Sequence, residues 1–269
     1  MRKDFGAVRL DDFIQDLART AGHIQKKAFH HTYSWRSKTG KGDIVTEIDE
    51  ACERLILDRI TREFPNYPIL SEESGAFGVE EDMPVWVIDP LDGTRNYKMG
   101  IPFFCTSIGL VRKGVPEIGA IYDPIHDEMF FAERGKGAFV NGERISIGCE
   151  DSLEDAIVSI SWVKQKVNRH TFLNFIDELS HQTSYFRRFG SAALVTAYVA
   201  CGRVDAYMQG GLNPWDMAAA VLLIEEAGGM ITDFQGKPID IRNKDIEVVT
   251  ANPKLHSILL EKVIRRDKW

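Results

Sequence analysis

The sequence of 269 residues contains few of the features that mark several large protein classes. It has four cysteines, far apart and without a C-x-x-C pair: Cys52, Cys105, Cys149 and Cys201. This spacing indicates neither a zinc site nor a disulfide framework, so we expect reduced thiols. No segment approaches the ~18 uninterrupted apolar residues of a transmembrane helix. The N-terminal residues lack the apolar centre of a signal peptide, and we therefore expect a cytoplasmic protein without a membrane partner.

The sequence also has fewer basic than acidic residues. The chain has 33 lysines and arginines against 40 aspartates and glutamates, which gives a formal net charge of -7. This balance argues against a nucleic-acid partner that is bound through its phosphates. An anionic small molecule would meet the same repulsion unless bound cations offset it. The composition is otherwise that of a globular protein, with 44% hydrophobic residues, and the length allows one large domain or two.

The strongest pattern lies in residues 86–97, which read WVIDPLDGTRNY. Apolar residues lead directly into Asp89 and Asp92, which predicts a buried strand that ends at a loop. Two such carboxylates repel each other in a dry interior unless a cation lies between them. Hard cations such as Mg²⁺ take oxygen ligands of this kind, and Gly93 and Thr94 add N–H groups and a hydroxyl. The alternative is an ordinary Asp-rich turn.

Two amphipathic helices are predicted near the N-terminus. Apolar residues at helical spacing predict the first over Leu10 to Phe29 and the second over Ile44 to Phe64. Thr46 is a suitable N-cap for the second helix, with Asp49 three positions later. On its own, Asp49 is explained as an acid in the first turn, where the helix dipole favours it.

Two polar segments lie near these helices. Residues 36–43 form a basic, glycine-containing loop, in which Lys38 or Lys41 either holds an anionic ligand or belongs to a solvated turn. Residues 71–75 follow a short apolar segment and carry adjacent glutamates. Glu72 is therefore a candidate metal ligand, although a surface turn explains the same residues.

An antiparallel meander is predicted over residues 85–147, where short strands alternate with hairpin turns such as Asn141-Gly142. The composition becomes polar and acidic at 149–155. We place a domain boundary there. The expected division is an N-terminal α+β domain over 1–148 and a C-terminal α/β domain over 149–269.

The second half alternates strands with helices, which favours an α/β layer. The expected strands cover 156–161, 184–189, 204–208, 230–233 and 247–250, and the expected helices 168–179, 190–201, 217–227 and 253–264. Small residues at Gly190-Ser191-Ala192 open one helix, where N–H groups either meet an anion or allow close packing. Asp216 follows Pro214 at the start of another helix, a common position for an acid.

Together, these segments contain four acidic residues at strand ends or helix starts: Glu72, Asp89, Asp92 and Asp216. An all-oxygen set without His or Cys favours Mg²⁺ over zinc. Magnesium keeps water ligands and binds substrate phosphate, and it lowers the pKa of such a water. The set therefore predicts hydrolysis of a phosphate ester by water. A covalent aspartyl-phosphate is disfavoured, because Asp89 and Asp92 are one residue further apart than in a D-x-D-G-T sequence.

The chain resembles the inositol monophosphatase family of lithium-sensitive, Mg²⁺-dependent sugar phosphatases. The resemblance extends from Lys38 to about Asn252. Its motifs occur in the family's order: GDIVTEID from Gly42, SEES from Ser71, WVIDPLDGT from Trp86, PWDMAA from Pro214 and EEAGG from Glu225. The resemblance implies a layered α-β-α-β-α sandwich, mixing α+β and α/β features, and a homodimer.

The resemblance also implies roles for individual residues. Two or three Mg²⁺ ions would be held by Glu72, Asp89, Asp92, Asp216 and the backbone carbonyl of Leu91. Glu72 would in this way also serve catalysis.

The same resemblance pairs Asp49 with Thr94 to orient and deprotonate the attacking water. The N–H groups of Gly93 and Thr94 would contact phosphate, and Lys38 would lie near it. The sugar site would contain Gly190, Ser191, Ala192, Gln209 and Asp216.

Gln209 departs from the animal enzymes of this family, which have a glutamate that holds ring hydroxyls. Glutamine still bonds hydroxyls but removes a negative charge, so a different or more anionic polyol becomes acceptable. The expected activity is hydrolysis of inositol monophosphate or a related sugar phosphate. The alternatives are fructose-1,6-bisphosphatase or NADP phosphatase activity, and a regulatory binding partner without a required activity.

Overall fold

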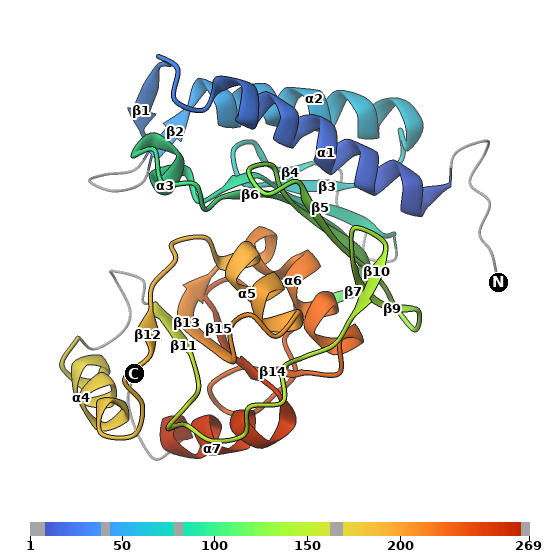
Figure 1. The fold of residues 1–269 in the computed structure, drawn as a ribbon. Coiled ribbons are helices and arrows are strands. Elements are labelled where there is room, and N and C mark those ends of the chain that lie inside the picture. Colours follow the sequence, from blue (N-terminus) through green and yellow to red (C-terminus); the bar gives the residue numbers. More distant parts are fainter. Residues whose placement is uncertain (1–8, 39–43, 78–82, 162–168, 265–269) are drawn as a thin grey trace.

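Five layers of helices and sheets alternate in the computed structural model, which describes residues 9–38, 44–77, 83–161 and 169–264. Figure 1 shows them from top to bottom: two helices, a large sheet, two central helices, a smaller sheet and two outer helices. This arrangement confirms the predicted α-β-α-β-α sandwich. The predictions for Lys41 and for the N-terminal residues lie outside the described part of the chain.

Helices α1 (Leu10–Ala28) and α2 (Glu47–Glu63) form the top layer. α1 turns one apolar face into the protein, and its acidic first turn and basic last turn suit the helix dipole. In α2, Thr46 accepts hydrogen bonds from the first turn, while Asp49 accepts one from the backbone N–H of Thr46. This reciprocal capping box confirms Thr46 as the N-cap.

The start of α2 differs from the prediction. Residues Ile44–Thr46 form a strand, β2, which pairs antiparallel with β1 (Trp35–Ser37). The helix consequently begins at Glu47, three residues later than expected. The reason is that all three residues of β2 are β-branched, and Thr46 as N-cap has an extended backbone (φ -110°, ψ 162°).

The large sheet has eight strands in the order β10-β9-β8-β7-β6-β5-β3-β4. Their bounds are β3 Ile69–Ser71, β4 Gly75–Phe77, β5 Val85–Asp92, β6 Cys105–Arg112, β7 Val115–Asp123, β8 Glu128–Glu133, β9 Gly137–Val140 and β10 Glu143–Ile145. Strands β5 to β10 form the predicted antiparallel meander. β3 extends this sheet by pairing parallel to β5, and the short helix α3 (Thr94–Lys98) follows β5.

The smaller sheet has the order β12-β11-β13-β15-β14. Its strands are β11 Val158–Ser161, β12 Phe186–Arg187, β13 Ala206–Leu212, β14 Met230–Thr232 and β15 Ile246–Ala251. The helices are α4 Arg169–Ser180, α5 Ala192–Ala200, α6 Pro214–Glu226 and α7 Pro253–Ile264. The alternation of strands and helices is confirmed.

Several bounds in this half differ from the predictions. β12 is shorter than expected, while β13 continues beyond Met208 through a register shift against β15. Helix α6 begins at Pro214 rather than Met217. Proline suits the first helical position, because a backbone N–H group there would have no carbonyl in the helix to bond. The predicted domain boundary near residue 149 lies between β10 and β11, and the division into two domains stays a prediction.

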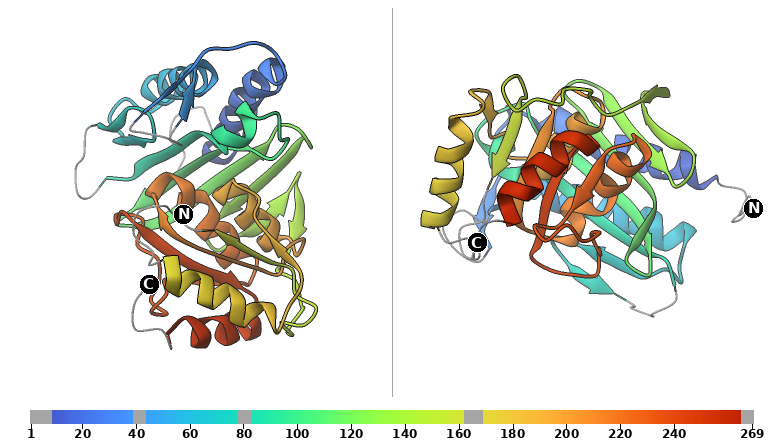
Figure 2. Two further views of the ribbon diagram at one scale, coloured as in Figure 1. Left: turned by 90° about the vertical axis from the view of Figure 1, so that its left-hand side faces the viewer. Right: turned by 90° about the horizontal axis from the view of Figure 1, so that it is seen from below.

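Helices α5 and α6 are buried between the two sheets, as Figure 2 also shows. The close approach of α6 to the large sheet requires two paired glycines. A Cβ atom on Gly109 would lie 2.9 Å from Cβ of Ala218, and one on Gly119 would lie 2.8 Å from Cα of Ala219. These glycines therefore let α6 pack closely against β6 and β7 of the large sheet.

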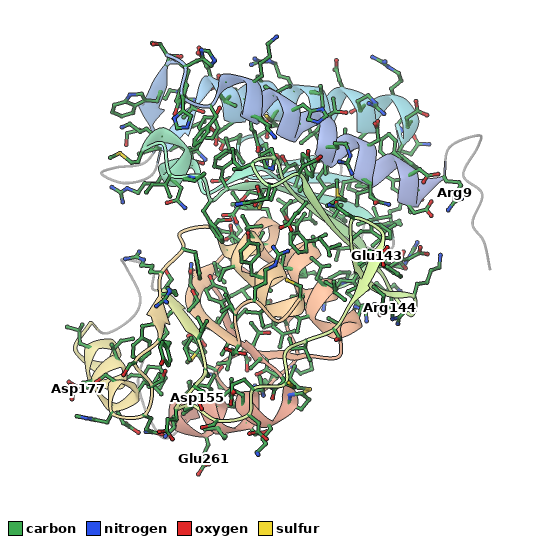
Figure 3. The ribbon with its side chains drawn as sticks, in the orientation of Figure 1. Arg9, Glu143, Arg144, Asp155, Asp177 and Glu261 are labelled. Atoms are coloured by element: carbon green, nitrogen blue, oxygen red, sulfur yellow. The ribbon has the colours of Figure 1, made fainter. Side chains whose placement is uncertain are left out.

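Apolar side chains fill the spaces between the layers, and charged residues such as Arg9, Glu143 and Asp177 lie at the periphery (Figure 3). Among the described helices, none combines the length and the apolar character needed to cross a bilayer.

Candidate active site

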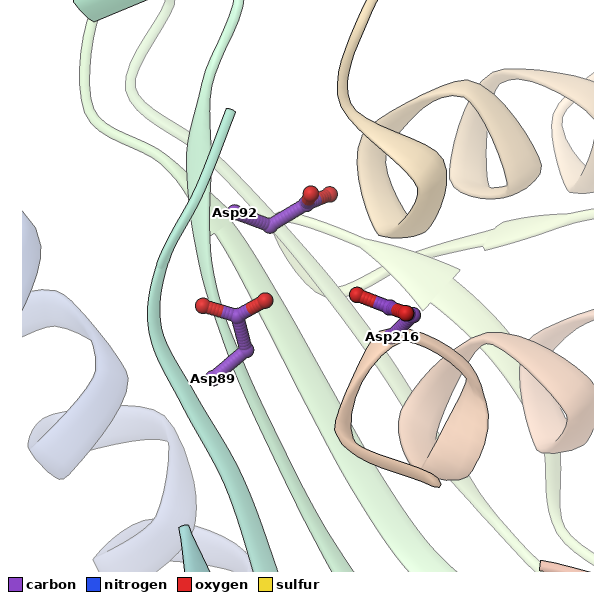
Figure 4. Close-up of side chains that lie close together, drawn as sticks. All are labelled: Asp89, Asp92 and Asp216. Atoms are coloured by element: carbon purple, nitrogen blue, oxygen red, sulfur yellow. The ribbon is translucent and has the colours of Figure 1, made fainter. Parts of the chain in front are cut away.

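Three aspartates from two distant parts of the chain meet beside the central helices. Asp89 and Asp92 belong to β5, and Asp216 lies in the first turn of α6. One carboxylate oxygen of each lies within 4.8 Å of those of the other two. Figure 4 shows their side chains converging on one space between β5 and the helix starts. The structure thus brings together three of the four acids that the sequence singled out as a set.

A bulge in β5 brings Asp89 and Asp92 to the same side. Asp89 lies opposite Ser107 and Asp92 opposite Cys105, with a register shift between them. Without the extra residue, side chains at i and i+3 would point to opposite faces of the sheet. The expectation that the buried strand ends in a loop at these aspartates was wrong, because β5 resumes its pairing at Asp92.

Side chains stabilise this bulge where proline removes a backbone donor. The carboxylate of Asp89 accepts a hydrogen bond from the N–H of Leu91 at 3.0 Å. The carbonyl of Pro90 accepts one from the amide of Gln25, a buried residue of α1, at 2.7 Å. Gln25 also donates to the Thr106 hydroxyl at 2.8 Å. α1 therefore fixes the backbone between the two aspartates.

The start of α5 holds Asp92 in place. The Ser191 hydroxyl and the N–H of Ala193 both donate to Oδ2 of Asp92, at 2.5 and 2.8 Å. Gly190 precedes them with φ of 85°, and a Cβ there would lie 3.0 Å from the Asn96 side chain. The small residues at this turn thus bring the N-terminus of α5 to an acid of the cluster. The proposed contact of Gly190, Ser191 and Ala192 with a sugar stays a prediction.

Burial makes the ionised form of these acids unfavourable. It raises the pKa of Asp89 and Asp216 well above the usual range, and neighbouring acids, Glu72 among them, raise both pKa values further. The pKa of Asp92 is raised to about 6, mainly by burial, although the hydrogen bond from Ser191 opposes this shift. Such a cluster ionises readily only beside a positive charge. The donor set fits a hard divalent cation such as Mg²⁺.

Glu72 lies in the turn that follows β3. Its backbone N–H donates to the carbonyl of Ile88 at 3.2 Å, next to the aspartates on β5. Nζ of Lys38 donates to Glu72 at 2.9 Å and to Glu73 at 2.6 Å. Burial alone would lower the pKa of Lys38, but these two carboxylates outweigh it and raise the pKa. The structure therefore joins the predicted Lys38 and Glu72 directly.

Asp49 and Thr94 also meet. The Thr94 hydroxyl lies 2.9 Å from Oδ1 of Asp49 and 3.0 Å from the carbonyl oxygen of Leu91. Asp49 is completely buried, and this burial raises its pKa to about 6, against the hydrogen bonds from Thr46 and Thr94. A carboxylate with this pKa accepts and releases a proton near neutral pH. The pair can thus take a proton from a water molecule beside Thr94.

Gly93 joins β5 to α3 in a left-handed conformation, with φ of 97°. A Cβ at this position would lie 3.0 Å from the carbonyl oxygen of Phe103, so a larger residue would be both strained and crowded. The turn consequently places Thr94 at the start of α3. The expected N–H contacts of Gly93 and Thr94 with phosphate stay a prediction.

Gln209 lies on β13, and its side-chain oxygen accepts a hydrogen bond from the Tyr207 hydroxyl at 2.6 Å. Tyr207 is buried, and its pKa is raised first by burial and then by the charges of Asp92 and Asp216. The tyrosine thus orients the side chain of Gln209. A contact of Gln209 with substrate stays a prediction.

Two buried residues that support this site were not predicted from the sequence: Gln25, which bonds the carbonyl of Pro90, and Glu53, which bonds Ser71 and Ser74 beside Glu72. Only Glu53 had a signal in the sequence. It is a glutamate among the apolar residues that α2 buries.

Comparisons with known proteins agree with this geometry. The profile of the inositol monophosphatase family matches residues 8–267. The Nus factor SuhB of Escherichia coli strain K12 is 40% identical over 90% of this chain and 91% of its own. A fructose-1,6-bisphosphatase/inositol-1-monophosphatase of Thermotoga maritima is 38% identical over 94% of each chain. The crystal structure of the suppressor protein suhB from Bartonella henselae superposes with a TM-score of 0.87, at 34% identity over 94% of this chain and 97% of that one. The chain therefore belongs to the inositol monophosphatase family.

Proposed function

We propose that this protein is a Mg²⁺-dependent phosphomonoesterase that hydrolyses inositol monophosphate or a related sugar phosphate. The main support for the proposal is that Asp89, Asp92 and Asp216 lie together, with one carboxylate oxygen of each within 4.8 Å of the others. The Asp49–Thr94 pair adds a proton acceptor that is linked to the cluster through the carbonyl of Leu91. A metal site and a proton acceptor side by side are the parts that hydrolysis by water needs.

The proposed Mg²⁺ ligands are Glu72, Asp89, Asp92, Asp216 and the carbonyl of Leu91. Bound Mg²⁺ would supply a lowered pKa for the attacking water and charge stabilisation for the phosphate oxygens. The ions would also offset the repulsion among these buried acids and the net charge of -7, both of which oppose an anionic substrate.

Two residues of the chain, Thr94 and Asp49, accept the proton of the attacking water. Thr94 gives its hydroxyl proton to Oδ1 of Asp49 while it accepts a proton from the attacking water. The pKa of Asp49, raised to about 6, suits this exchange near neutral pH. Lys38, next to Glu72, places an ammonium group close to the metal ligands, where it favours a bound phosphate.

The substrate class can be tested by measuring the hydrolysis of several phosphate esters. Phosphate release with Mg²⁺ would be compared for inositol 1-phosphate, fructose 1,6-bisphosphate and NADP, each with Asp89→Asn as the inactive control. We expect the highest kcat/KM for the inositol phosphate. A clear preference for either of the other compounds would replace it as the substrate, and equal rates for all three would refute a narrow specificity.

A regulatory role is the second candidate, because the relative from E. coli is described as a Nus factor. Under this alternative, partner binding and not phosphate release is the main activity. The variant Asp89→Asn separates the two. Loss of phosphate release with undiminished partner binding would favour the regulatory role.

We also propose a homodimer. Among the described residues, Trp35, Met99 and Ile101 expose 53%, 69% and 48% of their surface, and the first two line the same hollow beside α3. Exposed apolar side chains that gather in this way suit a protein contact. Light scattering of the wild type would give the dimer mass. Met99→Glu should shift the equilibrium towards the monomer.

A further inference from the structure

A buried glutamate of α2 is bonded to the turn that carries Glu72. Glu53 exposes only 6% of its surface and accepts three hydrogen bonds. The Ser71 hydroxyl donates to Oε1 at 2.5 Å, and the Ser74 N–H donates to the same oxygen at 3.0 Å. The Ser74 hydroxyl donates to Oε2 at 2.6 Å. One carboxylate thus holds the turn at both ends.

The residues between these two serines are Glu72 and Glu73. Lys38 contacts both of their carboxylates, at 2.9 and 2.6 Å. Glu72 is also bonded through its backbone N–H to β5. The direction of the Glu72 side chain therefore depends on how this short turn is fixed, and Glu53 supplies three of its hydrogen bonds.

The same helix also carries Asp49, which is bonded to Thr94. Asp49 and Glu53 are four residues apart, so they lie on one face of α2. This face is otherwise apolar, and its other buried residues are Ile48, Cys52, Ile56 and Ile60. An apolar side chain would suit such a face without the cost of burying a carboxylate. Since all three hydrogen bonds to Glu53 come from Ser71 and Ser74, which flank Glu72 and Glu73, holding that turn explains its presence.

We propose that Glu53 is a positioning residue that sets Glu72 in the geometry needed to bind a divalent cation. Because Glu53 and Asp49 lie on the same helix, Glu53 also fixes the position of Glu72 relative to the Asp49–Thr94 pair. The inference rests on the proposed function in that Glu72 is taken as a metal ligand. Glu53 itself contacts neither the cation nor the substrate.

The test measures Mg²⁺ binding to the full chain by titration calorimetry. Glu53→Ala removes every acceptor, and its affinity for Mg²⁺ should fall about 10–100-fold, the usual effect of removing a group that orients a metal ligand. Glu53→Gln keeps one acceptor for the Ser74 N–H, and its new amide donates to a serine hydroxyl, so its affinity should stay within about threefold of the wild type. Glu63→Gln, at the exposed end of α2, is the matched control and should bind like the wild type.

A merely structural role would give a different pattern. Thermal unfolding without Mg²⁺ measures the loss of stability separately, and the Mg²⁺-induced rise in Tm should shrink for Glu53→Ala but not for Glu53→Gln. In the phosphatase assay, Glu53→Ala should need more Mg²⁺ for half-maximal rate, while KM for the ester at saturating Mg²⁺ stays unchanged. Wild-type Mg²⁺ affinity in Glu53→Ala, or equal losses in the alanine and glutamine variants, would overturn the inference.

A second variant covers the case that Glu53→Ala does not fold. Ser74→Ala removes one hydroxyl donor from an exposed residue and should weaken Mg²⁺ binding a few-fold in the same direction, whereas an unchanged affinity overturns the inference. The binding assay needs no substrate, so failures of the two proposals are distinguishable. A wild type that binds Mg²⁺ but hydrolyses none of the esters would refute only the phosphatase function. A wild type that binds no Mg²⁺ would overturn the role of Glu53.

Discussion

The hydroxyl of Ser191 donates a hydrogen bond to the carboxylate of Asp92, 99 residues earlier in the chain, at 2.5 Å. Ser191 is the N-cap of α5, and its hydroxyl also accepts from the N–H of Leu194. One side chain therefore begins a central helix and holds an acid of the acidic cluster. This bond links the β5 bulge of the large sheet to the helices between the two sheets.

Replacing Ser191 with alanine should affect stability and metal binding together. Loss of the N-cap should lower the free energy of unfolding by about 1 kcal/mol. Loss of the donor to Asp92 should weaken Mg²⁺ binding about tenfold or more. Urea unfolding and calorimetric titration measure the two effects, with Ser257→Ala in the exposed face of α7 as the control. Unchanged Mg²⁺ affinity would show that the hydroxyl does not orient Asp92.

Asp89→Asn should abolish phosphate release but stabilise the protein without metal. Burial and three neighbouring acids, Glu72, Asp92 and Asp216, disfavour the charge of Asp89, and asparagine removes that charge at nearly the same size. In EDTA, the Tm of the variant should exceed that of the wild type, and Mg²⁺ should no longer raise it. Asp58→Asn, at an exposed position of α2, should change neither quantity. Full activity in Asp89→Asn would refute the metal assignment.

Thr94 offers a test of the proton path through its hydroxyl. Thr94→Val keeps the shape but removes the group that bonds to Asp49, so kcat should fall about 10²–10⁴-fold. Thr94→Ser keeps the hydroxyl and should retain most of the activity. Comparable kcat values for the valine variant and the wild type would remove Thr94 from the mechanism, whatever the effect on KM.

Without metal, stability should decrease as the pH rises. The pKa of Asp49 and that of Asp92 are each raised to about 6 in the folded protein, from 3.8 in the unfolded chain. The folded state therefore binds more protons than the unfolded chain, and their stabilising effect is lost as the pH passes through 6. Between about pH 5 and about pH 8, these two acids should lower the free energy of unfolding by roughly 3 kcal/mol.

Urea unfolding in EDTA at these two pH values measures that change. Mg²⁺ should reverse the trend, because the cation binds the ionised carboxylates and displaces their protons. Asp49→Asn should show a smaller pH dependence than the wild type in EDTA. A metal-free protein that is more stable at the higher pH would contradict the raised pKa values.

The candidate acids were predictable because each stands next to a local signal. Asp89 and Asp92 follow an apolar strand, Asp216 follows a proline at a helix start, and Asp49 follows a capping threonine. Glu72 was predicted less directly, since a pair of glutamates in a turn has no distinguishing pattern. In each case the residue type and its local surroundings carried the information.

The contacts between these residues were not predictable in the same way. The bonds of Asp92 to Ser191 and of Pro90 to Gln25 connect segments far apart in sequence, and no local pattern reports such pairs. The bulge in β5 was missed because proline normally ends a strand, whereas Gln25 and the Asp89 side chain stabilise the interruption. Strand β2 was missed because its apolar residues also fit the face of the following helix.

The placement of Asp216 on α6 has a consequence for the nascent chain. Asp89 and Asp92 leave the ribosome with the first sheet, well before α5 and α6 have been synthesised. Until those helices arrive, the sheet lacks the layer that packs on Gly109 and Gly119 and the donors that hold Asp92. A growing chain that ends before α6 therefore has an incomplete acidic cluster that stays open to solvent. The acidic cluster is therefore complete only after synthesis has passed α6 and the layers have assembled.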